Sequence, residues 1–452
     1  MHPFLNSARF GPNIALRIAG LLTVCALTIL AGCGEVAEDG EVVGSEGDPA
    51  GPRVTVHTQE ALEPSSPVRM SQDPILRLGT VTGPEEERFQ RVDGAVSLSD
   101  GSVAVLDAGA RAILVFGEDG ELTRRLGDEA GEGPRLRLPQ YMTVMGTDTL
   151  LVWDAGEEWI AGFHAGPGAD PDVQARGWVV EVALPPEVER VVALHTLASG
   201  QVALVALGSR VSDQGSGGLH RQDAFLLFLE EFQGGEEAGM SVGVVQSVEV
   251  AGPGFILRDQ HEAGAPDEGP AGTAARVREW FHPALLTAAQ EDWIWHSDGT
   301  DGLLQGWRPG EATVGWRMEL ELPPITTADE VEGLHAWELE ETGDDEERRE
   351  RVRGRQADRA YPDRLPPLRL LRADALGRLW IGLTQLPPRT LPAGGGPLVR
   401  EWLVLKEDGE LMGRVSLPVD GVWLAADSHG VLILRFDALD LPFVERFTLD
   451  GP

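Results

Sequence analysis

Two carboxylates close together in the sequence are the first candidates for chemistry. Asp298 and Asp301 lie in the segment SDGTDG at residues 297–302, near enough to share a cation. The segment lacks the alternating oxygen ligands of a full calcium loop, and Asp-Gly pairs are typical of tight hairpin turns. The sequence therefore favours a hairpin turn here, with a metal site as the alternative.

The other groups that could support catalysis are dispersed. The histidines show no HExxH or HxH spacing, and no Gly-x-Ser-x-Gly elbow occurs. Tryptophans could line a site for a sugar or an apolar ligand, but strands favour aromatic residues, so packing is the favoured interpretation. The sequence predicts no catalytic residues, no metal ligands and no cofactor. The side chains considered are His164, His195, His282, His296, Trp153, Trp159, Trp293, Trp295 and Trp307.

One cysteine has the setting of a modification site. Arg9 and Arg17 precede an apolar stretch that ends in Leu30-Ala31-Gly32-Cys33, and these four residues resemble a bacterial lipobox. At a lipobox the thiol receives a diacylglyceryl group and the peptide is cut just before it. The apolar stretch is shorter than the roughly 20 residues that span a bilayer. A plain signal peptide that happens to contain Cys33 is the alternative.

These features divide the chain into three expected parts. They are a lipoprotein signal peptide at residues 1–32, the lipidated Cys33 with an acidic flexible linker at 33–70, and a folded region at 71–452. Cys25 would leave with the signal, so the mature chain would hold one cysteine and no disulfide. Acyl chains on Cys33 would bind the membrane.

The residue after the cysteine bears on localisation. Gly34 follows Cys33, whereas bacterial lipoproteins with Asp at that place tend to stay at the inner membrane. By this resemblance we expect the chain in the bacterial cell envelope, anchored at the outer membrane and facing the periplasm or the exterior.

The net charge limits the partners. The 452 residues carry a formal net charge of -36, with 73 acidic residues against 37 Lys and Arg. Binding to nucleic acid needs clustered basic residues, so we expect no nucleic-acid partner. The hydrophobic content of 42% is typical of a globular chain. We expect the protein to be monomeric.

Repeats indicate the elements that would position these residues. Asp107-Ala108-Gly109 is followed by Ile113 and Phe116, and Asp154-Ala155-Gly156 is followed by Ile160 and Phe163 at identical offsets. Asp298 and Trp307 repeat, a third time, the spacing that separates Asp107 from Phe116 and Asp154 from Phe163. Hairpins that recur at intervals of about 50 residues predict propeller blades. The expected first strands begin near Arg91, Gln140, Val191, Phe281, Pro367 and Gly421.

This count predicts an all-β fold, a six-bladed β-propeller. The last unit, from Gly421, supplies only three strands, while residues 74–83 add one strand before the first blade. Pairing of this N-terminal strand with the last blade would close the ring and cover two sheet edges. A capping-box pattern from Thr327 predicts a helical insertion at about residues 326–360, between blades 4 and 5, that rests one apolar face on the ring. Residues 233–275 predict a strand plus a mobile loop.

The chain resembles NHL-like six-bladed propellers, and more closely the lipid-anchored six-bladed propeller proteins of bacteria, most of them functionally unassigned. The residues that carry the resemblance are the two Asp-Ala-Gly copies, GEGPRLRLP from Gly131, LPPLRLLRADALGRLWI from Leu365 and the hairpin from Trp402 to Leu417. Ala110 and Glu157 stand where NHL repeats usually have Asn. The resemblance therefore implies the fold and no particular NHL activity.

Two functions are compatible with these observations. The first is a binding or scaffold module for a protein, peptide or glycan partner. The second is a lactonase or hydrolase with a metal in the central channel, resting on Asp298, Asp301 and scattered histidines. Six-bladed lactonases use Asn ligands in the channel, whereas the only asparagines here, Asn6 and Asn13, lie in the signal, so the sequence favours the non-enzymatic module. The predicted binding residues, in the turns between second and third strands, are Arg111, Glu158, Trp159, Arg210 and Asp301.

Overall fold

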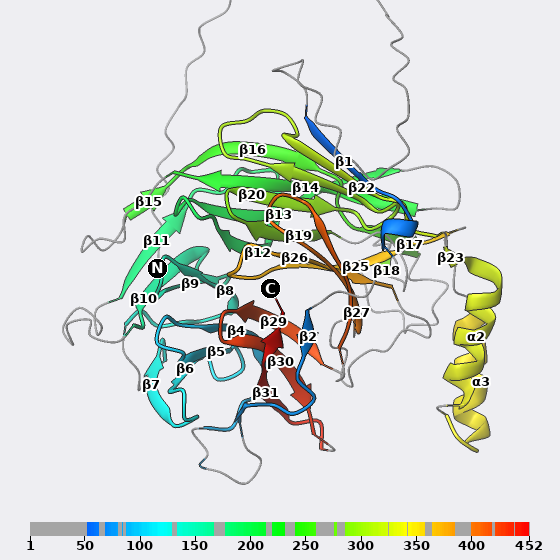
Figure 1. Cartoon of the computed structure of the whole chain (residues 1–452), viewed down its shortest axis with the longest axis horizontal. Coiled ribbons are helices and arrows are strands. Elements are labelled where there is room, and N and C mark those ends of the chain that lie inside the picture. Colours follow the sequence, from blue (N-terminus) through cyan, green and yellow to red (C-terminus); the bar gives the residue numbers. More distant parts are fainter. Residues whose placement is uncertain are drawn as a thin grey trace, which may run out of the picture. The chain divides into compact units, whose positions relative to one another are not determined.

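Six sheets follow one another along the chain and surround one axis as the blades of a β-propeller (Figure 1). This confirms the predicted all-β, six-bladed fold. The computed structural model describes residues 52–62, 68–79, 84, 87–128, 133–166, 177–213, 219–230, 240–258, 275–277, 285–323, 325–340, 342–357, 364–384, 399–417, 421–437 and 439–451. The predicted signal peptide, Cys33 and His282 lie outside these residues. In the part that is described, no helix is both long enough and apolar enough to cross a bilayer.

In each of the first three blades the strands follow in chain order. Blade 1 consists of β4 (Val92–Ser97), β5 (Val103–Asp107), β6 (Ala112–Phe116) and β7 (Leu122–Leu126). Blade 2 consists of β8 (Pro139–Met145), β9 (Thr149–Asp154), β10 (Trp159–His164) and β11 (Trp178–Val182), with β15 (Met240–Val242) added in parallel. Blade 3 consists of β12 (Val188–Thr196), β13 (Val202–Asp213), β14 (Leu219–Leu229) and β16 (Val244–Val250), and β14 also pairs with β17 (Gly254–Arg258), which pairs with β18 (Ala275–Val277).

Blades 4 and 6 each receive a strand from the N-terminal segment, whereas the four strands of blade 5 follow one another in the chain. Blade 4 consists of β19 (Leu286–Gln290), β20 (Trp293–Ser297), β21 (Leu303–Trp307) and β22 (Trp316–Leu320), with β1 (Arg53–His57) added in parallel. Blade 5 consists of β25 (Leu368–Ala373), β26 (Leu379–Leu383), β27 (Glu401–Leu405) and β28 (Leu411–Ser416). Blade 6 consists of β29 (Val422–Asp427), β30 (Gly430–Phe436), β31 (Pro442–Phe447) and β3 (Leu76–Leu78). The first strands begin close to all six predicted positions.

The ring closes through the N-terminal strand, as predicted. β3 pairs antiparallel with β31 and completes blade 6. A second short pair, β2 (Arg69–Met70) with β32 (Leu449–Asp450), reinforces this closure. The inner strands of neighbouring blades contact one another around the ring, including β29 of blade 6 and β4 of blade 1.

The segment before β3 is more ordered than the sequence indicated. Residues 33–70 were expected to form a flexible linker, but β1 lies on blade 4 and the 3-10 helix η1 (Glu60–Leu62) contacts β28 of blade 5. Leu62 is buried in the core shared by these two blades. Residues 53–62 and 68–78 therefore join blades 4, 5 and 6, and we call them the N-terminal clasp. The predicted boundary at residue 71 was wrong for the described part of the linker, because pairing with β22 orders a segment that has little core of its own.

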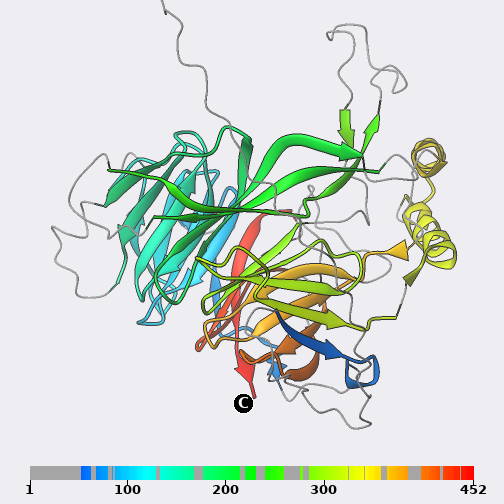
Figure 2. The ribbon, with the colours of Figure 1, turned by 90° about the horizontal axis from the view of Figure 1, so that it is seen from above.

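The predicted helical insertion lies between blades 4 and 5. Its helices are α2 (Thr327–Glu340) and α3 (Glu346–Ala357), and β23 (Ile325–Thr326) pairs with β24 (Arg364–Leu365) at its base. α2 packs against α3 and β23. The sequence predicted instead that one apolar face of this helix rests on the ring. The buried Gln356 side chain of α3 donates to the carbonyl oxygen of His335 in α2 at 3.0 Å. The two helices thus form a hairpin at the edge of the ring (Figures 1 and 2).

Packing between blades explains the near-continuous apolar sequence of the middle strands. β5 reads VAVLD and is buried along its whole length. Val103 and Val105 face blade 6, whereas Ala104 and Leu106 face blade 2. Because successive side chains of a strand point to opposite faces, each middle strand contributes to two inter-blade cores.

The Asp-Ala-Gly repeat fixes the turn between the second and third strands of a blade. Asp107 is fully buried and its carboxylate accepts backbone N–H groups from Gln90 at 2.8 Å, Arg91 at 2.9 Å, and Gly109 and Ala110 at 3.1 Å. The carboxylate therefore ties this turn to the chain that enters the same blade. We call this end of the ring the distal end. The proximal end carries the turns between first and second strands and the loops between third and fourth strands.

Candidate functional site

Three of the five predicted binding residues occupy distal turns, in blades 1, 2 and 4. Arg111, Glu158 and Asp301 lie between second and third strands, and Trp159 begins β10, whereas Arg210 lies within β13 because that strand is longer than expected. Arg111 and Glu158 have left-handed backbones, with φ of 55° and 56°. Arg111 and Trp159 line one groove of about 740 Å³ between blades 1 and 2. The structure thus brings two of the five residues into one groove.

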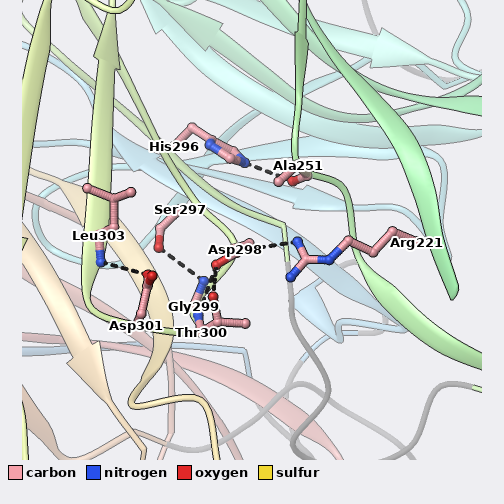
Figure 3. A network of polar contacts seen from close by, with 9 residues as sticks. All are labelled: Arg221, Ala251, His296, Ser297, Asp298, Gly299, Thr300, Asp301 and Leu303. Atoms are coloured by element: carbon pink, nitrogen blue, oxygen red, sulfur yellow. Dashed lines mark hydrogen bonds and ion pairs between the residues drawn. The ribbon is translucent and has the colours of Figure 1, made fainter. Parts of the chain in front are cut away.

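Asp298 and Asp301 bind different partners (Figure 3). Asp298 accepts from the Thr300 backbone N–H at 2.9 Å and from Arg221 Nη1 at 2.7 Å. Asp301 accepts from the Leu303 backbone N–H at 3.4 Å. Burial acts to raise the pKa of Asp298, but the Thr300 hydrogen bonds and the Arg221 guanidinium outweigh it and hold this pKa below its ordinary value. This geometry favours the hairpin interpretation of the SDGTDG segment.

Four of the histidines and tryptophans singled out from the sequence are buried, namely His296, Trp153, Trp295 and Trp307. His296 is buried, with Nε2 2.9 Å from the Ala251 carbonyl oxygen, and burial lowers its pKa. Trp153 and Trp295 are buried between blades. Within the described ranges no group of three or more His, Cys, Asp or Glu side chains is placed to hold a metal ion.

A large cleft lies at the proximal end, between blades 4 and 5. Its volume is about 1440 Å³. Four turn segments line it, two from each blade: residues 291–293 and 308–316 from blade 4, and residues 376–378 and 406–412 from blade 5. Arg53 of the N-terminal clasp lines it as well. We call this cavity the blade 4–5 cleft.

Three arginines of the cleft each lie over a tryptophan ring. Arg53 Cζ lies 3.8 Å from the Trp316 ring centroid, and Arg308 Cζ lies 3.9 Å from that of Trp293. Arg378 Cζ lies 5.6 Å from the Trp380 ring centroid. Stacking on an aromatic ring orients a guanidinium and leaves its N–H edge available for other partners.

Direct contacts between blades 4 and 5 hold the floor of the cleft. Gln290 Nε2 of blade 4 donates to the Gly377 carbonyl oxygen of blade 5 at 2.7 Å, and Gln290 Oε1 accepts from Trp295 Nε1 at 2.7 Å. Gly409 of blade 5 approaches the Trp316 ring so closely that a Cβ atom would lie 2.6 Å from it, and its φ is +84°. Only glycine fits this position without strain.

The N-terminal clasp fixes the outer wall of the cleft. Arg53 donates to the Asp408 carbonyl oxygen, and His57 Nε2 lies 2.9 Å from the Gly409 carbonyl oxygen. Burial lowers the pKa of His57, although this hydrogen bond opposes the shift. Since β1 is also paired with β22, the clasp joins both sides of the cleft. The cleft is therefore preformed.

Charged side chains with spare hydrogen-bonding capacity surround the cleft. Arg308 makes no hydrogen bond or ion pair through its guanidinium with a described residue, and the same holds for the carboxylates of Glu291, Glu311 and Glu407. Glu291 also has a left-handed backbone, with φ of 51°. The cleft thus presents both donors and acceptors.

Sequence reasoning missed this cleft. Trp293 was noted from the sequence, but Arg53 was assigned to the linker, and the loop that carries Arg308 was not considered. The available signal was a pair of arginines next to strands that carry tryptophan. Arg308 directly follows β21, which ends in Trp307, and Arg378 directly precedes β26, which contains Trp380. This signal becomes meaningful only when blades 4 and 5 are adjacent.

Comparisons with known proteins add the following findings. No protein-family model matches the sequence, and no curated protein matches it. Among solved structures, a member of the DUF4221 family from Bacteroides vulgatus is similar, with a TM-score of 0.41, 9% identity, and coverage of 85% of this chain and 99% of that chain. Virginiamycin B lyase from Staphylococcus aureus has a TM-score of 0.34, 9% identity, and coverage of 85% and 90%. Regucalcin, a calcium-binding protein from Agrobacterium tumefaciens, has a TM-score of 0.33, 9% identity, and coverage of 88% and 97%.

At 9% identity and with TM-scores below 0.5, these similarities do not indicate an activity for this chain. The six-bladed fold rests on the strand pairing of this chain itself. Membership of the NHL-like or lipid-anchored propeller group stays a prediction.

Proposed function

We propose that this chain is a lipid-anchored, extracytoplasmic β-propeller that binds a glycan in the blade 4–5 cleft. One observation carries the proposal: arginine, carboxylate and indole side chains line a single preformed cleft. Sugar hydroxyls donate and accept hydrogen bonds at once, so a glycan site needs both kinds of partner. Arg308 offers donors, and Glu291, Glu311 and Glu407 offer acceptors.

The size of the cleft supports a ligand of several units. Pockets for small molecules usually measure about 300–1,000 Å³. The blade 4–5 cleft, at about 1440 Å³, is larger. Trp293 and Met412 add apolar surface to its lining, on which the C–H faces of sugar rings can pack.

The charge of the chain favours a neutral glycan. With a formal net charge of -36, the protein repels anionic molecules at long range. Within the cleft the four basic residues Arg53, Arg308, Arg378 and Lys406 stand against five acidic ones, Glu291, Asp292, Glu311, Glu407 and Asp408. A neutral polyhydroxylated ligand meets no net repulsion from such a lining.

The predicted lipid anchor would place the protein in the cell envelope. If Cys33 is acylated, Arg53 at the cleft wall lies 20 positions after the anchored residue in the sequence. A chain of this length reaches at most about 70 Å. The cleft would then stay near the surface of the outer membrane, on the periplasmic or exterior side, where envelope glycans lie.

Titration of the purified protein with neutral, amino and acidic oligosaccharides tests the proposal. Tryptophan fluorescence and calorimetry report binding, because Trp293 lines the cleft. The double variant Arg308→Ala, Glu311→Ala should weaken binding at least about tenfold, the equivalent of 1.4 kcal/mol. The matched control is Arg317→Ala, Glu319→Ala, which removes an exposed ion pair on β22 of the same blade and should leave binding unchanged.

Two outcomes would contradict the proposal. Saccharide binding that persists in the cleft variant would place the site elsewhere on the ring. If a peptide or protein binds in the cleft and no oligosaccharide does, the protein would still be a binding module, but its ligand would be a peptide or protein and not a glycan.

A further inference from the structure

The central channel is a second cavity, separate from the blade 4–5 cleft. Its volume is about 670 Å³, and residues of the inner strands of all six blades line it. The two cavities share none of their described lining residues. Among the described lining residues of the channel, Arg372 on β25 is the only arginine or lysine.

Arg372 has no carboxylate partner in the described part of the chain. Its Nη1 donates to the carbonyl oxygen of Leu371 at 2.9 Å. The carboxylates that line the same channel are held by other groups. Asp374 accepts from Arg378 Nε at 2.7 Å and from Trp380 Nε1 at 2.8 Å. Asp93 pairs with Arg91 at 3.0 Å, and Asp427 accepts from the His429 backbone N–H at 2.6 Å.

The positive charge of Arg372 persists in spite of its surroundings. Burial lowers the pKa of its guanidinium, and no neighbouring carboxylate offsets this effect. An arginine stays charged in proteins, because its ordinary pKa is above about 12. Arg372 is half-buried in the lining of the channel. A charge that is partly removed from water and has no partner is destabilising, and an anion of suitable shape would offset that cost.

Neutral hydrogen-bonding groups line the channel near this charge. Burial, and then the charge of Arg372, lower the pKa of His195 to about 4, so His195 is neutral near pH 7. Its Nε2 lies 3.0 Å from Thr287 Oγ1. His195, Thr287 and Arg372 belong to blades 3, 4 and 5, which are neighbours in the ring.

We propose that the central channel binds an oxyanion, the carboxylate or phosphate group of a small ligand, through Arg372. The planar guanidinium can donate two parallel hydrogen bonds to such a group. His195 and Thr287 can add neutral hydrogen bonds from the neighbouring blades. Because the net charge of the chain repels anions, an anion enters only where a specific cation holds it.

Titrations with sodium phosphate and, separately, sodium acetate test this site in the purified full chain, at constant ionic strength set with sodium chloride. Calorimetry should show saturable binding of at least one of these anions. NMR should show that the bound anion raises the pKa of His195 above about 4, because it offsets the charge of Arg372. Arg372→Gln should weaken anion binding at least about tenfold. Arg317→Gln, on the exposed side of blade 4, is the matched control and should bind as the wild type does.

The stability of the variant separates a binding role from a structural one. Removal of an uncompensated charge should leave the Tm of the anion-free protein unchanged or raised, whereas loss of a structural arginine would lower it. If Arg372→Gln does not fold, two other measurements decide the question. They are the change in the pKa of His195 when the anion binds to the wild type, and anion binding by Arg372→Lys, which retains the charge.

Each remaining outcome has a definite meaning. Binding of phosphate alone or acetate alone assigns the class of anion. The proposal is wrong if neither anion binds, or if Arg372→Gln binds both as tightly as the wild type. The cleft variant Arg308→Ala, Glu311→Ala should keep the full anion response, so failure of the glycan proposal and failure of this one are distinguishable.

Discussion

Trp316 Nε1 donates a hydrogen bond to Thr55 Oγ1 at 3.1 Å, across 261 positions of the sequence. The contact ties the N-terminal clasp to blade 4, and Arg53 covers the same indole ring. The clasp then continues past blade 5 to the strands that complete blade 6. Ring closure in this protein therefore involves three blades. Blade 6 combines strands from both ends of the folded region, and the clasp also contacts blades 4 and 5.

Replacement of Thr55 by Val should lower the free energy of unfolding by about 1–3 kcal/mol, because the buried indole N–H loses its acceptor. Trp316 is 2% exposed, so water cannot readily replace the hydroxyl. Chemical denaturation of the purified protein measures the change. Val54→Thr alters the neighbouring residue, which is 52% exposed, and should change stability by no more than about 0.5 kcal/mol. Equal losses in the two variants would show that the hydrogen bond is not the cause.

The Asp107 carboxylate makes a second prediction possible. It accepts four backbone N–H groups, and Asn would place an N–H₂ group against some of these donors. We expect Asp107→Asn to lower the free energy of unfolding by about 3 kcal/mol, since hydrogen bonds to a charged group contribute about 1.5–3 kcal/mol. Asp119→Asn is the control, because Asp119 lies in an exposed turn and accepts one backbone N–H, from Glu121. A small effect at Asp107 would mean that the repeated aspartate is dispensable for the turn.

The repeated blades could be predicted because their signals are local. Asp-Gly turns place glycine where φ is positive, as at Gly120 and Gly409. The buried aspartate of each Asp-Ala-Gly copy binds backbone groups within its own blade, so its spacing recurs with the blade. The three-strand last unit indicated closure, because a free sheet edge needs a partner.

The clasp and the cleft could not be predicted in this way. Three of the five residues of β1 are exposed and two are half-buried, so β1 has little core of its own and becomes a strand only because β22 offers an edge. The cleft combines turns that are far apart in the sequence. The predicted binding residues lie at the distal end, whereas the cleft lies at the proximal end, because residue type alone did not distinguish the two ends of the ring.

Acid should destabilise the folded protein in part through His195. Burial, together with Arg372, lowers the pKa of this residue from 6.5 to about 4 in the folded state. Between these two values the unfolded chain binds more protons, so stability falls as the pH falls from about 6.5 to about 4 and this contribution is constant below. A shift of this size corresponds to at most about 3 kcal/mol. Denaturation curves between pH 4 and 7 should show a smaller loss for His195→Gln than for the wild type. Parallel pH profiles would show that other groups cause the loss.

Anchoring through Cys33 gives the last prediction. Each buried methylene of an acyl chain contributes about 0.8 kcal/mol, so two or more chains hold a protein at a membrane where one is marginal. In a bacterial host with lipoprotein processing, the wild type should incorporate labelled fatty acid and enter the detergent phase of Triton X-114. Cys33→Ser should incorporate no labelled fatty acid, and after signal cleavage it should remain in the aqueous phase. Cys25→Ser is the matched control, because Cys25 lies inside the predicted signal and should leave lipidation intact. Fatty-acid incorporation that persists in Cys33→Ser would rule out the lipobox, and with it the tether that places the cleft near the membrane.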